Sequence, residues 1–196
     1  SAGTGEHALL ENIPLVPSLL SYARKNNLRI DAISWHEFDN PEDISTRVDA
    51  IRQFFVQQPA FCKPSCPELH INEFSSPEEH LIPGWTVAWL SWLEKTNVDW
   101  ASRSCWWVER NPPLVRERFG DCWAGLNGLF LADNRTPQPV YWVQNFYATL
   151  GDKNRLSVET DSARTIAIAS RNDDERSVHI LLGRYSCGKN GFWCGG

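Results

Sequence analysis

The 196-residue sequence lacks several common features, and each absence argues against a class of protein. It has 19 Lys and Arg against 24 Asp and Glu, a net charge of −5 with no basic block, so we expect no nucleic-acid partner. No apolar run is long enough to span a bilayer and no signal peptide is present, so we expect no membrane partner. The absence of a Gly-rich phosphate loop disfavours a nucleotide-binding α/β sheet.

Met is also absent, whereas Trp is abundant, with 10 residues. Without an initiator Met, the chain is expected to be a processed product or a fragment rather than a complete primary translation product. Flat aromatic side chains suit the apolar C–H face of a pyranose ring, although large aromatics also fill ordinary cores. The Trp content therefore suggests carbohydrate binding without establishing it.

The six cysteines fall into three close pairs, a pattern that favours disulfides and an oxidising, secreted location. The predicted bonds are Cys62–Cys66, Cys105–Cys122 and Cys187–Cys194. The last pair lies symmetrically about Asn190-Gly191, a hairpin turn signal. Zinc binding by the first pair is the alternative, but no second half-site stands at metal-ligand spacing. Asn134-Arg-Thr is an N-glycosylation sequon, which is consistent with secretion.

Hydrophobic spacing predicts strands that alternate with helices, followed by a region of strands alone. Strands are predicted at 30–36, 69–73 and 99–107, helices at 14–27, from Pro41, at 84–96 and at 137–150, and later strands at 156–160, 165–169 and 178–182. Alternation of this kind predicts an α/β fold with a parallel sheet, and the later strands predict an antiparallel β module. A small open α/β sheet is one candidate for residues 1–150. The other is the C-terminal part of a (β/α)₈ TIM barrel, because only about three of its eight units are present.

Polar and aromatic residues stand at the C-terminal ends of the predicted strands, where TIM-barrel enzymes place their catalytic groups. The sequences at these ends are Ser34-Trp-His36, Asn72-Glu-Phe74 and Cys105-Trp-Trp107. Gly125-Leu-Asn-Gly-Leu-Phe and Pro137-Gln-Pro-Val-Tyr follow. In order and spacing these motifs resemble glycoside hydrolase family 39, the β-xylosidase and α-L-iduronidase family, over residues 1–150. Residues 151–196 would then be the start of its accessory β-sandwich domain.

The resemblance implies a retaining O-glycosidase that acts on a carbohydrate by double displacement and needs no cofactor or metal. Glu73 would be the nucleophile, at the end of the family's seventh strand. Too few βα units follow it for Asn72-Glu73 to be the fourth-strand acid/base pair instead. The acid/base Glu is expected upstream, so we predict little hydrolysis by this chain alone. Phe38 stands near the place where the family often has an aromatic hydroxyl, so a hydrogen bond from Tyr to the nucleophile is not expected.

The remaining candidate site residues surround the predicted nucleophile, and the candidate substrate-binding residues are His36, Asn72, Arg103, Trp106 and Trp107. His36 and Arg103 could supply hydrogen-bond donors to Glu73. Strand alternation lets only one of the two tryptophans face the pocket. Trp85, Trp89 and Trp92 have helical spacing and are expected in the core, whereas Glu37 is expected in a solvated loop. A non-catalytic carbohydrate-binding or cell-wall protein is the alternative function, and a small α/β interaction module is a third.

Overall fold

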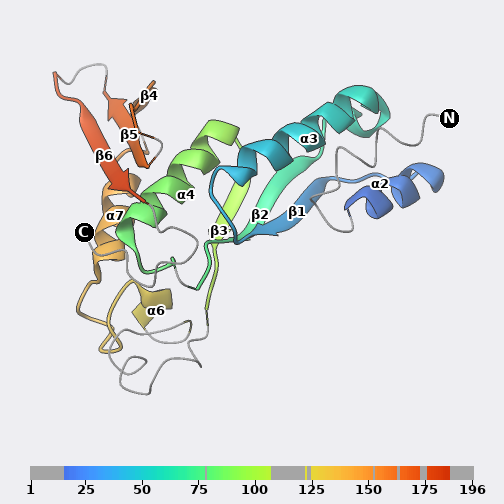
Figure 1. Ribbon diagram of the computed structural model, residues 1–196. Coiled ribbons are helices and arrows are strands. Elements are labelled where there is room, and N and C mark those ends of the chain that lie inside the picture. Colours follow the sequence, from blue (N-terminus) through green and yellow to red (C-terminus); the bar gives the residue numbers. More distant parts are fainter. Residues whose placement is uncertain are drawn as a thin grey trace. The chain divides into compact units, whose positions relative to one another are not determined.

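The computed structural model describes residues 16–77, 79–106, 122, 125–151, 153–162, 164–172 and 176–185. Its elements are α2 (Val16–Lys25), β1 (Ala32–Glu37), α3 (Asp43–Gln57), η1 (Pro59–Cys62), β2 (Glu68–Phe74), α4 (Pro83–Thr96), β3 (Trp100–Arg103), α6 (Gly125–Gly128), α7 (Pro139–Ala148), β4 (Asn154–Leu156), β5 (Thr165–Arg171) and β6 (His179–Arg184). One sheet is parallel, in the order β1-β2-β3, and the other is antiparallel, in the order β4-β5-β6 (Figure 1). The predicted α/β class is therefore confirmed.

The chain divides into two compact units. The first comprises Ser1–Phe74 and Trp92–Arg103, and the second comprises Ser75–Ser91 and Ser104–Gly196. The parallel sheet lies in the first unit and the antiparallel sheet in the second. The TIM barrel, the β-sandwich and a domain boundary at residue 150 remain predictions.

Helix α3 covers one face of the parallel sheet (Figure 1). Its apolar residues recur every three or four positions and so form one stripe, and five of them are 5% exposed or less: Ile44, Val48, Ile51, Phe54 and Phe55. Asp43 stands in the first turn, where a negative charge is favoured by the helix dipole. The predicted helix from Pro41 thus exists and begins two residues later.

The two faces of the parallel sheet differ in burial. Side chains on the covered face are buried, namely Ile33, Trp35 and Glu37 of β1 and Leu69, Ile71 and Phe74 of β2. On the exposed face, Ala32, Ser34 and His36 of β1 are exposed. This alternation is the period-two pattern of a strand packed on one side.

Strand β3 is shorter than predicted, because it ends at Arg103 rather than at Trp107. Beyond it, Ser104 Oγ and Trp106 Nε1 both donate to the carbonyl oxygen of Ser75, at 2.5 and 2.9 Å. These two residues therefore bind the turn after β2 instead of extending the ladder.

The second unit packs helix α4 against β6, and glycines allow the close approach. A Cβ on Gly84 would lie 2.0 Å from the carbonyl oxygen of Arg184, and one on Gly183 would lie 2.5 Å from Val87 Cβ. The predicted core position of Trp85 and Trp89 is confirmed, since they are 7% and 0% exposed, whereas Trp92 is partly exposed.

Two large apolar side chains of β6 are exposed on one face of the antiparallel sheet. Its register pairs Ala167 with Leu182 and Ala169 with Ile180. Ile180 and Leu182 are 58% and 65% exposed, whereas both alanines of β5 are buried. The opposite face carries Ile166, Ile168 and Gly183, all buried.

Candidate functional site

A one-residue β-bulge near the end of β2 decides which face carries Glu73. The register pairs Trp35 with Ile71 but His36 with Glu73, so Asn72 is the extra residue. Without the bulge, Glu73 would fall opposite the buried Glu37. With it, Glu73 stands on the same face as His36, and Phe74 takes the buried position. Bulges are common beside active sites, where they redirect a side chain.

His36 and Glu73 meet on the exposed face at the carboxyl end of the parallel sheet. His36 Nδ1 lies 3.6 Å from Glu73 Oε2, and the two side chains are 51% and 41% exposed. The pair is therefore accessible to a ligand, and its imidazole can orient the carboxylate. A solvated carboxylate held beside a donor can act as a nucleophile or as a hydrogen-bond acceptor.

Glu37 corrects one expectation, because it is not in a loop. It is the last residue of β1, and its side chain is 0% exposed. Its Oε1 accepts from Trp35 Nε1 at 2.5 Å, and its Oε2 accepts from Arg47 of α3. Burial raises the pKa of Glu37, although the bonds from Trp35 and Arg47 act in the opposite direction. In the sequence, only the alternation of side chains along the strand indicates that Glu37 is buried.

The role of Arg103 as a hydrogen-bond donor to Glu73 stays a prediction. The register places its backbone beside Phe74, the residue that follows Glu73. Burial lowers its pKa to about 10, so the guanidinium stays charged at neutral pH. Asn72, the bulge residue, is exposed.

In the second unit, Trp106 is fixed by its indole nitrogen to Ser75, as described above, and its ring is partly exposed. Ser75 itself has a φ of 78° and is 3% exposed. A buried carbonyl that accepts two hydrogen bonds holds this non-glycine residue in the left-handed region. The indole is thus a rigid aromatic surface, one of the side-chain types that stack on sugars.

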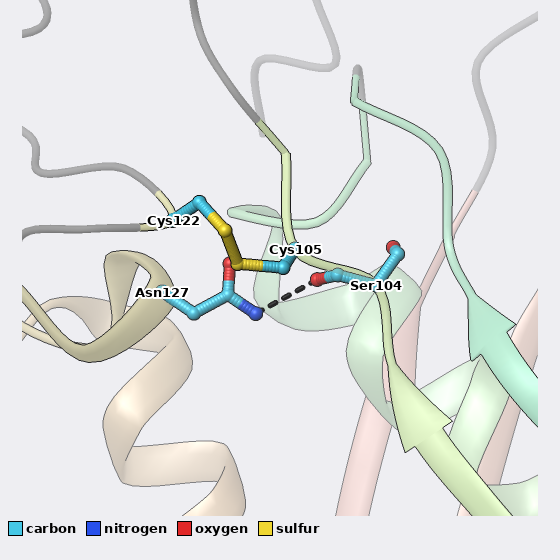
Figure 2. The surroundings of a disulfide bond; sticks show 4 residues. All are labelled: Ser104, Cys105, Cys122 and Asn127. Atoms are coloured by element: carbon cyan, nitrogen blue, oxygen red, sulfur yellow. Dashed lines mark hydrogen bonds between the residues drawn. A yellow bond between two sulfur atoms is a disulfide. The ribbon is translucent and has the colours of Figure 1, made fainter.

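The Cys105–Cys122 disulfide belongs to the same neighbourhood, and Figure 2 shows it beside Asn127. Asn127 Nδ2 donates to the carbonyl oxygen of Ser104 at 2.7 Å. A second disulfide joins Cys62 to Cys66, so these two sulfurs are not zinc ligands here. The sequence had paired the same cysteines.

Asn127 lies in a turn of four successive residues with positive φ, from Gly125 to Gly128. Such a run is costly for L-residues, and here glycines occupy both ends. Hydrogen bonds hold the turn: Gly125 N donates to Asn134 Oδ1, and Gln138 Nε2 donates to Gly128 O, at 2.7 and 2.8 Å. Sequence reasoning noted these glycines only as part of a motif. Asn134, the sequon residue, is exposed.

Two predictions lie outside the described residues, namely the role of Trp107 and the Cys187–Cys194 disulfide. Within the described part of the chain, no helix has the length and apolar character needed to cross a membrane. The same residues include no group of three or more His, Cys, Asp or Glu placed to hold a metal ion.

Comparison with solved structures finds a similar fold in a glucosidase. The glucosidase from Croceicoccus marinus is similar with a TM-score of 0.64 and 16% identity, over 92% of this chain and 38% of that one. N2152 from Neocallimastix frontalis gives a TM-score of 0.48 and 17% identity, over 78% of this chain and 38% of that one. This chain thus spans well under half of either structure. No protein-family model matches the sequence, and no curated protein matches it.

Proposed function

We propose that this chain carries the nucleophile side of a retaining O-glycoside hydrolase site, of the family 39 type, with Glu73 as the nucleophile. The observation that carries the proposal is the bulge at Asn72, which leaves the Glu73 carboxylate exposed beside His36 at the carboxyl end of a parallel sheet. In barrel enzymes this edge holds the chemistry. The likeness of the fold to a glucosidase supports the same class of reaction.

The exposed face of the parallel sheet supports a barrel. Parallel sheets are normally covered on both faces. Here Ser34, His70 and Trp100 share one row of the register, and Trp100 is 67% exposed. We propose that further βα units of the same protein enclose this face as the interior of a (β/α)₈ barrel. The two disulfides support an oxidising, extracellular location.

The proposed reaction has two displacements. The Glu73 carboxylate attacks the anomeric carbon of a β-linked or iduronide-like sugar, and the bond to the leaving oxygen breaks as a second carboxylic acid gives that oxygen its proton. Water, deprotonated by the second carboxylate, then attacks the same carbon and releases Glu73. His36 orients the nucleophile. The second carboxyl group is expected elsewhere in the barrel, about 5–5.5 Å from Glu73.

Covalent labelling of the full-length protein tests the role of Glu73. A 2-deoxy-2-fluoro glycosyl fluoride should add one glycosyl group, which peptide mass spectrometry should locate on Glu73. The Glu73→Gln variant should not be labelled. Glu68→Gln is the matched control, because Glu68 is also an exposed carboxylate of β2 that pairs with a histidine, His70, at 2.8 Å. Equal loss of labelling in both variants would contradict the assignment.

A rescue experiment separates the nucleophile from an acid/base residue. In Glu73→Gly, azide should attack an activated aryl glycoside in place of the carboxylate and expel the phenolate. The product should be a glycosyl azide of inverted anomeric configuration. A retained configuration would identify Glu73 as the acid/base residue instead. Sugar binding that persists in Glu73→Gln, with no labelling of the native protein, would favour the non-catalytic carbohydrate-binding alternative.

A further inference from the structure

The buried carboxylate of Glu37 is costly in terms of stability alone. A carboxylate loses its hydration on burial, and a buried ion pair often stabilises a protein less than apolar residues of the same shape. The raised pKa of Glu37 agrees with this, because desolvation outweighs the help from its partners. An apolar residue would continue the covered face that Ile33 and Trp35 begin. The presence of Glu37 therefore calls for a reason other than stability.

The position of Glu37 provides that reason. Glu37 follows His36 directly, and in the register it pairs with Phe74, the residue after Glu73. Alternation therefore puts Glu37 behind the His36–Glu73 pair, on the opposite face of the sheet. This placement argues against Glu37 as a proton donor to a substrate on the exposed face.

Each oxygen of the Glu37 carboxylate has its own donor. Trp35 Nε1 bonds Oε1 from within β1, and Arg47 bonds Oε2 from α3. The Arg47 side chain is 17% exposed, and it also lies 3.6 Å from Asp39, which is 76% exposed. The pair of bonds ties the last residue of β1 to the helix that covers the sheet.

We propose that Glu37 is a positioning residue, which clamps the carboxyl end of β1 to α3 and so holds His36 opposite Glu73. This inference rests on the proposed function of Glu73. Displacement of a group in such a site by about 1 Å can cost about 10²-fold in rate. The clamp thus accounts for a buried charge that packing does not need.

The test compares Glu37→Gln with Asp39→Asn in the full-length protein. Gln keeps an acceptor for Trp35 but removes the charge that faces Arg47. We expect the rate constant of labelling by the fluoro sugar to fall by about 10- to 10²-fold, with the half-saturating concentration of the probe unchanged. Asp39→Asn removes the exposed partner of the same arginine and should label at the native rate.

Two readouts separate positioning from a purely structural role. A urea midpoint that falls in Glu37→Gln while the labelling rate stays native would overturn the proposal. If Glu37→Gln does not fold, Trp35→Phe removes the indole N–H donor, with part of a buried ring, and leaves the carboxylate and Arg47 in place. That variant should also label more slowly, and a native rate in it would equally refute the clamp.

Failure of the proposed function would look different, because the native protein itself would not be labelled. Amide hydrogen exchange then tests the clamp without a substrate. Glu37→Gln should speed exchange in peptides covering residues 32–38 and 68–74, and Asp39→Asn should not. Unchanged exchange at both strand ends would refute the clamp whatever Glu73 does.

Discussion

Glutamine at two neighbouring positions of β2 tests the bulge directly. Glu73 and Phe74 are adjacent, yet the Glu73 side chain is 41% exposed whereas Phe74 is 4% exposed. Phe74→Gln forfeits the burial of an aromatic ring, about 1.5–3 kcal/mol. It also buries an amide without a designed partner, at a further cost of about 1–3 kcal/mol. We therefore expect the free energy of unfolding to fall by about 3–5 kcal/mol.

Glu73→Gln should behave differently, because it changes an exposed carboxylate whose contact with His36, at 3.6 Å, is open to solvent. We expect a change within about 0.5 kcal/mol. Urea unfolding followed by Trp fluorescence measures both variants. With a slope of about 2 kcal/mol/M, the midpoint should move by about 1.5–2.5 M for Phe74→Gln and by about 0.25 M for Glu73→Gln. A large shift in Glu73→Gln would mean that its carboxylate is in the core, and the register with a bulge would be wrong.

Three further outcomes are expected. Because burial holds the pKa of Glu37 above its ordinary value of 4.5, the folded protein keeps this proton to higher pH than the unfolded chain does. The free energy of unfolding should therefore fall as pH rises from about 4.5 toward the raised pKa, and urea titrations should show no such fall in Glu37→Gln. Replacing Cys105 and Cys122 by Ser opens a link with a sequence separation of 17 and should cost about 3 kcal/mol, which thermal unfolding with and without a reductant should reproduce. Gly125→Ala would put a Cβ 2.1 Å from the carbonyl oxygen of Phe130 at a φ of 69°, so its melting temperature should drop by the equivalent of about 2 kcal/mol, and an unchanged melt would contradict the left-handed turn.

Much of the architecture could be predicted from periodicity. The stripe Ile44, Val48, Ile51 and Phe55 determines which side of α3 is buried, and the alternation in β1 fixes its faces. Glu73 could be singled out by its place at the end of a strand and by the motif around it. Each of these signals lies within one short segment, so it can be found in a single sequence.

The bulge and the shorter β3 could not be predicted, because each depends on contacts between distant segments. Asn72 is an extra residue only when β2 is aligned with β1, and the sequence of β2 alone does not indicate it. Strand β3 ends early because Ser104 and Trp106 bind Ser75, about 30 residues away in the chain. Sequence patterns describe one segment at a time, whereas the register is a property of two.

The exposed apolar side chains of Ile180 and Leu182 on β6 have a practical consequence for handling the protein. Apolar surface in water attracts more apolar surface, and sulfate or phosphate strengthens that attraction. The protein should therefore bind the dye ANS while still folded, in proportion to the area left uncovered. It should also precipitate at a lower ammonium sulfate concentration than its Leu182→Lys variant does.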